Sequence, residues 1–109
     1  MCMTPILVLV TVSSVEEGMK IARALVEKQL AACVNLLPDH TSIYRWEGKI
    51  ETASEHLLLI KSAKELWESL QAEVKTLHSY ECPEIVALRA EEIEAGYAKW
   101  WNDSLIGPY

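Results

Sequence analysis

The sequence predicts a single α+β domain in which one antiparallel sheet carries two helices on the same face. Three observations lead to this class. Two continuous apolar runs are typical of buried strands, a helical pattern of apolar residues follows each run, and a long hairpin separates the two halves. A chain of 109 residues needs no second domain, so residues 1–109 are expected to fold as one unit.

The first half begins with a strand and continues with an amphipathic helix. The run "PILVLVTV", Pro5 to Val12, is rich in Leu and β-branched residues and suits a strand buried on both faces. Ser14 and Glu17 then form a capping-box pattern, which predicts a helix over roughly residues 14–31. The apolar positions of this helix recur at helical spacing: Val15, Met19, Ala22, Val26 and Leu30.

The middle of the chain predicts a long β-hairpin. "ACVNLL" returns to a strand, Pro38 and Asp39 interrupt it, and two further strand-like stretches meet near Gly48. Both arms are longer than the average strand of about five or six residues. We therefore expect an extended hairpin between the second and third strands.

The second half repeats the strand–helix–strand pattern. Ser62 and Glu65 form another capping-box pattern, and the helix that they predict should end near His78. The apolar face of this helix includes Trp67, which we expect in the core: Ala63, Leu66, Trp67, Leu70, Val74 and Leu77. Pro83 lacks an N–H and suits the first position of a strand over 83–90.

A last helix is predicted within residues 91–106, with Ile93, Tyr97 and either Trp100 or Trp101 on one face. The full order is then β-α-β-β-α-β plus a C-terminal helix. Two β-α-β units of this kind form a ferredoxin-like sandwich, with an antiparallel sheet and both main helices on one face.

The other face of the sheet must also be hidden. A sheet covered on one side should alternate apolar and polar residues, yet "ILVLV" and "LLLI" are apolar throughout. A second copy of the chain is the simplest cover. Trp46, beside Tyr44 near the hairpin end, would anchor such an interface, because a buried aromatic of this size hides roughly 150–250 Å². We expect Tyr44 and Trp46 at the interface.

The composition argues against several classes of function. The net charge is −6 and the basic residues are scattered among Glu, so nucleic acid is not an expected partner. No stretch has the features of a signal peptide or a membrane span, which predicts a cytoplasmic protein without a membrane partner. Serines and histidines stand in no recognisable catalytic pairing, so no enzyme is predicted. Cys2, Cys33 and Cys82 are expected as reduced thiols.

The stretch "HSYECPE" contains the residues with the clearest chemistry. His78 and Cys82 supply imidazole and thiolate, the ligands that favour copper and zinc over magnesium and calcium. Two ligands do not complete a site, so others must come from elsewhere in the fold or from a neighbouring chain. The alternative is structural: His78 caps the second helix, Cys82 is a small buried apolar residue, and Cys33 lies in the core.

Five stretches carry a family resemblance. "LAACVNLLP", "SIYRWEGKIE", "LLLIKS", "HSYECPEIVAL" and "YAKW" resemble, in this order and at these spacings, the CutA family of divalent-cation-tolerance proteins. The resemblance runs from about Ile6 to Leu105. It implies a ferredoxin-like subunit in a tight homotrimer whose hairpins extend onto neighbouring chains. It also implies a role in tolerance to copper and other divalent cations, and a similarity to the trimeric PII signalling proteins.

Individual residues match the motifs of this family. Cys33 matches the cysteine of "AACVN", and five residues match the family's "HPYExPE" motif: His78, Tyr80, Glu81, Pro83 and Glu84. Ser79 replaces the usual proline. Cys82 stands where the family more often has Val, Thr or another small residue, so the resemblance gives this cysteine no metal role. The candidate metal ligands are His78, Cys82, Cys33 and Glu84.

Two functions remain open on this basis. The first is a homotrimer that binds divalent metal ions, most plausibly Cu²⁺, in metal tolerance, with no obligatory cofactor. The second is a PII-like signalling or scaffold module that binds a small molecule or a protein partner between its subunits.

Overall fold

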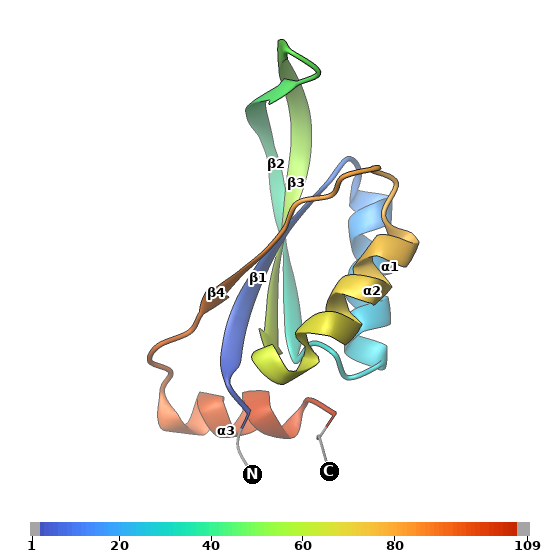
Figure 1. Ribbon diagram of the computed structural model, residues 1–109. Coiled ribbons are helices and arrows are strands. Elements are labelled where there is room, and N and C mark those ends of the chain that lie inside the picture. The colour runs from blue at the N-terminus through green and yellow to red at the C-terminus, as the bar shows by residue number, and fades with distance from the viewer. Residues whose placement is uncertain (1–2, 107–109) are drawn as a thin grey trace.

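The computed structural model describes residues 3–106, so the expectation for Cys2 lies outside the described residues. The elements follow in this order: β1 (Pro5–Val12), α1 (Val15–Glu27), β2 (Cys33–Trp46), β3 (Lys49–Ala63), a 3₁₀ turn η1 (Lys64–Leu66), α2 (Trp67–Leu77), β4 (Ile85–Arg89) and α3 (Ala95–Asp103). The strands form one sheet in the order β2-β3-β1-β4, and all neighbours are antiparallel. Helices α1 and α2 cover one face (Figure 1). The predicted α+β, ferredoxin-like class is confirmed.

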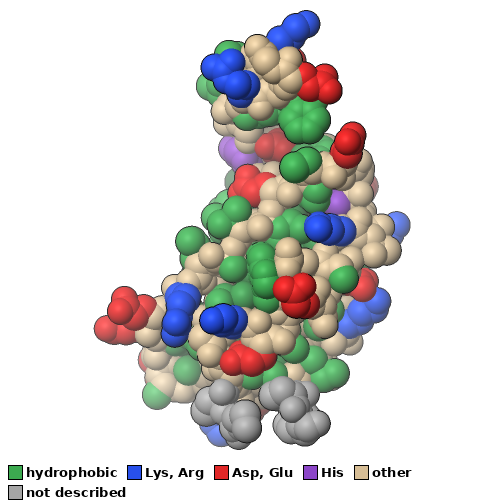
Figure 2. Space-filling view, in the orientation of Figure 1, with side chains coloured by type: hydrophobic (Ala, Val, Ile, Leu, Met, Phe, Trp, Pro, Cys, Tyr) green, Lys and Arg blue, Asp and Glu red, His purple; other side chains and the backbone are tan. Residues whose placement is uncertain are grey.

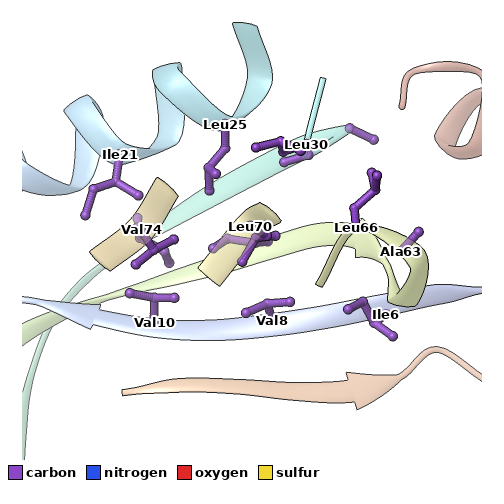
Figure 3. Close-up of a cluster of buried hydrophobic side chains, with 14 of the residues drawn as sticks. Ile6, Val8, Val10, Ile21, Leu25, Leu30, Ala63, Leu66, Leu70 and Val74 are labelled. Carbon is purple, nitrogen blue, oxygen red and sulfur yellow. The ribbon is translucent and has the colours of Figure 1, made fainter. Parts of the chain in front are cut away.

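The core lies between the sheet and these two helices. Alternate residues of β1, namely Ile6, Val8 and Val10, are buried on the helix side. They face the side chains that α1 and α2 contribute from above, as Figure 3 shows: Ile21, Leu25, Leu70 and Val74. These four side chains are fully buried. The predicted apolar face of α2 therefore contributes to the core.

The predicted face of α1 is wrong: Val15, Met19 and Val26 are 44%, 40% and 44% exposed, and Leu30 reaches the core only from the loop. Helix α1 instead buries Gly18, Ile21 and Leu25, because Gly18 has no side chain and lets this face of the helix lie close to Val12 and Leu36.

Helix α1 begins as predicted and ends early. The Ser14 hydroxyl accepts the N–H of Glu17 at 3.1 Å and caps the helix. The helix ends at Glu27 rather than near residue 31, because Gln29 adopts a left-handed backbone with φ 58°. Leu30 still reaches the core from the loop that follows, and its N–H bonds the Leu25 carbonyl.

The second predicted capping box is wrong. Ser62 lies near the end of β3, and its hydroxyl donates to the Leu30 carbonyl at 2.6 Å. The Glu65 carboxylate instead accepts the N–H and the hydroxyl of Thr4, at 2.9 and 3.1 Å. Pairing with β1 extends β3 as far as Ala63, so α2 begins only at Trp67, after the 3₁₀ turn. Trp67 is partly buried and packs against the edge of the core.

The hairpin of β2 and β3 projects well beyond the body of the molecule (Figure 1). Its turn lies at Glu47 and Gly48, as predicted, and φ is positive at both residues, 50° and 80°. Two such residues between paired Trp46 and Lys49 are typical of the turns that match strand twist. Pro38 and Asp39 do not end β2. The pairing register shifts between Leu37 and His40, so the interruption is a bulge within one long strand.

The C-terminal helix α3 lies at the end of the sheet that is farther from the hairpin turn (Figure 1). Strand β4 begins at Ile85, so Pro83 precedes the strand rather than opening it. Of the two candidate tryptophans in α3, Trp101 is the buried one, and its indole N–H donates to the Ser62 carbonyl at 2.9 Å. Trp100 stays 45% exposed. None of the helices within residues 3–106 has the length and apolarity that crossing a membrane requires.

Candidate functional site

The sheet face away from α1 and α2 is apolar, and within residues 3–106 it is partly open to solvent. Leu9 of β1 pairs with Leu59 of β3 on one side and Val86 of β4 on the other, which places the three side chains in one row. A second row contains Leu7 and Leu88. Val86 and Leu88 are 45% and 50% exposed. We call this surface, formed by Leu7, Leu9, Leu57, Leu59, Val86 and Leu88, the open sheet face.

Figure 2 shows hydrophobic side chains reaching the surface of the body and of the hairpin, with Lys and Arg side chains at the hairpin end. On the hairpin, Tyr44 and Trp46 are 43% and 45% exposed in the single chain. Ile43 and Ile50 beside them are 71% and 62% exposed. Exposed apolar side chains therefore occur on both hairpin arms as well as on the body.

His78 is buried and both of its ring nitrogens have partners. Its Nε2 lies 2.7 Å from the Thr11 carbonyl, an acceptor, so Nε2 carries the hydrogen. Its Nδ1 accepts the N–H of Tyr80 at 3.1 Å. The ring therefore joins the end of β1 to the loop after α2, rather than capping the carbonyls of α2. A metal ion could bind His78 only by displacing one of these hydrogen bonds.

Glu17 supports the same loop. Its carboxylate accepts hydrogen bonds from the N–H and the hydroxyl of Ser79 and lies 3.7 Å from His78 Nδ1. Burial raises the pKa of Glu17, but these bonds from Ser79 and the nearby His78 outweigh it and hold the pKa below its usual value. The 78–84 loop is thus fixed by polar contacts to α1 and β1.

Cys33 lies away from this loop. It opens β2 opposite Lys61, and its Sγ is 3.8 Å from the Lys61 ammonium. The same ammonium bonds the Tyr97 hydroxyl at 3.0 Å, and this contact, opposed by burial, helps to raise the pKa of Lys61. Cys33 is half-buried. It belongs to the end of the sheet where Leu7 pairs with Lys61, beyond the reach of the 78–84 loop.

A pocket of about 590 Å³ lies where the hairpin leaves the body. Loop 80–84 forms one wall and β2 the other, while Thr11 and Glu55 come from β1 and β3. The wall residues include three aromatics, three carboxylates and one thiol: Tyr44, Trp46, Tyr80, Glu55, Glu81, Glu84 and Cys82. The structure therefore brings Cys82 and Glu84 together with both predicted interface aromatics.

Glu55 was not predicted as a site residue. It is 7% exposed, and one carboxylate oxygen accepts the Tyr80 hydroxyl at 2.7 Å. Burial raises the pKa of Glu55, but hydrogen bonds from Ser42 and Tyr80 outweigh burial and lower it. Burial and this carboxylate together raise the pKa of Tyr80. At neutral pH the pair is therefore an ionised carboxylate and a neutral phenol. A Glu inside a strand-like stretch carries no sequence signal for such a role.

The predicted metal ligands do not form one cluster. Within residues 3–106 there is no group of three or more His, Cys, Asp or Glu side chains placed to hold a metal ion. Cys82 is exposed and shares the pocket wall with Glu84, His78 is committed to its hydrogen bonds, and Cys33 lies elsewhere. The described residues of one chain thus offer an incomplete ligand set.

Comparison with known proteins places these features in a family. The family model of the CutA1 divalent ion tolerance protein matches residues 6–104. The chain is 47% identical over 97 residues to the divalent-cation tolerance protein CutA of Thermus thermophilus, covering 89% of this chain and 94% of that protein. It is 42% identical over 99 residues to the chloroplastic protein CutA of Arabidopsis thaliana, but spans only 54% of that longer relative while 91% of this chain is covered.

Solved structures agree with the sequence match. The Thermus thermophilus divalent cation tolerance protein superposes with a TM-score of 0.91 at 46% identity, over 93% of this chain and 98% of that one. The Archaeoglobus fulgidus protein, described as a periplasmic divalent cation tolerance protein, superposes with a TM-score of 0.89 at 37% identity, over 92% and 97% of the two chains. Similarity that extends over nearly the whole chain in sequence and structure shows that this protein belongs to the CutA family of divalent-cation-tolerance proteins.

Proposed function

We propose that the protein acts in divalent-cation tolerance as a cytoplasmic homotrimer that binds Cu²⁺ or another divalent cation with ligands from more than one chain. No obligatory cofactor and no catalytic reaction are part of this proposal. The observation that carries it is the combination of an uncovered apolar sheet face with a ligand set that a single chain leaves incomplete.

The open sheet face supports the assembly. Rows of Leu and Val across three strands would remain in water in a monomer, and soluble monomers rarely expose apolar patches of this extent. An obligate interface of this kind buries more than about 2,000 Å² and resembles a protein core. Tyr44 and Trp46 on the hairpin would extend the contact onto a neighbouring chain.

The proposed metal ligands differ in how readily a metal ion can reach them. Cys82 and Glu84 are exposed on the pocket wall, so they can meet a metal ion without rearrangement. Cys33 is half-buried at the edge of the open sheet face, and its role would depend on a neighbouring chain. His78 would first have to release the Thr11 carbonyl or the Tyr80 N–H, so we assign it the smallest share of metal binding.

Calorimetric titration of the reduced trimer with Cu²⁺ and Zn²⁺ tests the proposal. We expect saturable binding that Cys82→Ser weakens by tenfold or more, since thiolate ligands favour these ions. Thr76→Ala is a control of similar size, because the Thr76 hydroxyl bonds only the Ala72 carbonyl on the surface of α2. Heats no larger than those of a buffer blank would contradict metal binding.

The pocket favours a second candidate, a PII-like module that binds a small molecule. Its volume of about 590 Å³ lies within the range of small-ligand sites. Thermal-shift screening with nucleotides and metabolites separates the two candidates, because any ligand that binds the native assembly must raise its melting temperature. A flat screen together with firm metal binding would favour the first candidate.

A further inference from the structure

Glu55 is a buried carboxylate that forms no ion pair with another residue of the described part of the chain. Glu55 is 7% exposed, and its carboxylate accepts hydrogen bonds from neutral hydroxyls, among them those of Tyr80 and Ser42. The ion pairs within residues 3–106 involve Glu17, Glu73 and Asp103 but not Glu55. His40 lies opposite Glu55 in the hairpin register and its charge helps to lower the pKa of Glu55, although no ion pair joins the two side chains. A buried charge in a protein is normally paired, and within residues 3–106 no Lys or Arg side chain forms an ion pair with this carboxylate.

The charged side chains that line the pocket in front of Glu55 are all acidic. Glu81 and Glu84 stand on its wall with Glu55, and no Lys, Arg or His side chain from the described part of the chain lines it. Three carboxylates around one concavity create a negative potential that attracts cations and repels anions. The pocket is therefore unsuited to phosphate or carboxylate ligands.

The aromatic walls indicate the kind of cation. Tyr44, Trp46 and Tyr80 line the same space as the carboxylates. Aromatic faces attract ammonium groups through their quadrupoles and also pack against the carbon atoms that such groups carry, as in the aromatic sites that bind quaternary ammonium ligands. A bare metal ion would gain little from these walls.

From this arrangement we propose that the pocket binds a small organic ammonium ion, with its charge toward Glu55 and its alkyl groups against Tyr44 and Trp46. This ligand differs from the divalent metal of the proposed function. The metal depends on the Cys82 thiol and on further ligands from other chains, whereas the ammonium site is built from the carboxylate and the aromatics of one chain.

The pocket opens on the same side of the sheet as the open sheet face. The pairing of His40 with Glu55 and of Leu37 with Leu57 places Glu55 on the side of Leu57, and Tyr44 follows along the same side of β2. A neighbouring copy would therefore lie beside the pocket and could add a wall. The competing source of positive charge is a Lys or Arg side chain of that copy, and the experiment must separate it from a free ligand.

Titration of the native assembly with tetramethylammonium tests the proposal, with tert-butanol as a neutral probe of similar size. The readout is the indole N–H resonance of Trp46, assigned by its loss in Trp46→Leu. We expect saturable shifts with the ammonium ion and none of comparable size with the alcohol, because the carboxylate charge supplies the selectivity.

Two substitutions with matched controls locate the binding. Glu55→Gln should weaken tetramethylammonium binding by tenfold or more, while Glu68→Gln removes the same charge from an exposed position on α2, outside the pocket, and should change binding less than twofold. Trp46→Leu should also weaken binding, measured by calorimetry. Trp100→Leu is its control, since Trp100 is 45% exposed like Trp46 but lies on α3, outside the pocket.

Three results would overturn the inference. Equal shifts with tetramethylammonium and tert-butanol would leave no role for the charge. Tetramethylammonium binding that Cys82→Ser abolishes and Glu55→Gln leaves intact would place the ion at the thiol rather than at Glu55. Absence of saturable tetramethylammonium binding to the wild-type assembly would show that the pocket does not take up an ammonium ion.

Discussion

A single charge placed on the open sheet face should break the assembly. Val86 on β4 and Val26 on α1 are 45% and 44% exposed in the single chain, so Val86→Asp and Val26→Asp are the same change at nearly the same exposure. In a monomer both variants would keep the new carboxylate in water. Each would lose about half the burial of a valine, roughly 1 kcal/mol.

In the proposed trimer the two variants differ. Val86 would be buried against a neighbouring chain, and desolvating an unpaired carboxylate costs several kcal/mol per ion. A cost of about 3 kcal/mol per chain corresponds to a factor of about 150 in the association constant for each copy. Val26 remains on the outer surface of α1, so its substitution should leave the assembly intact.

Light scattering after size exclusion measures the outcome directly. We expect the wild type and Val26→Asp at about three times the chain mass of 12.3 kDa, and Val86→Asp at smaller masses that grow with protein concentration. A monomeric wild type would refute the argument that the open face is covered. A trimeric Val86→Asp of unchanged stability would show that β4 lies outside the interface.

Three further predictions concern the fold. Leu70→Ala, in the fully buried core, should lower the free energy of unfolding by about 2–5 kcal/mol in urea titrations, and a loss below about 1 kcal/mol would contradict the packing described. Ser14→Ala should cost about 1 kcal/mol in the same assay through loss of the α1 cap, whereas no change would mean that the cap contributes nothing. Burial raises the pKa of Glu17, but hydrogen bonds from Ser79 outweigh burial and keep this pKa below its usual 4.5. The ionised carboxylate therefore stabilises the folded state fully above pH 4.5, and this stabilisation is lost as the pH falls through the lower pKa of the folded state. Glu17→Gln should therefore flatten the decline of stability with pH below about 4.5, and a curve as steep as that of the wild type would contradict this role.

The fold could be predicted from the sequence because its signals are local and mutually consistent. The continuous apolar run of β1, the Ser14 cap and the turn at Gly48 each specify an element without help from the rest of the chain. The wrong predictions occur where contacts between residues distant in the sequence determine the local structure. Ser62 has a capping pattern, yet pairing of β3 with β1 and a bond to the Leu30 carbonyl keep it in the strand.

The candidate site could be predicted only in part. The "HSYECPE" stretch predicts a site, and two of its residues, Cys82 and Glu84, line a pocket. The sequence alone could not show that the His78 ring is occupied by Thr11 and Tyr80, because these bonds join segments distant along the chain or depend on the loop conformation. Glu55 escaped notice for the same reason, since its burial results from packing of the 78–84 loop over the hairpin base.

The central claim is that neighbouring chains complete a metal site that one chain leaves incomplete. Anomalous scattering at the copper edge from crystals of the assembly soaked in Cu²⁺ tests it most directly. We expect a peak whose ligands include Cys82 or Glu84 and come from at least two chains. A map without a peak, or a copper ion held by the side chains of one chain alone, would contradict the account.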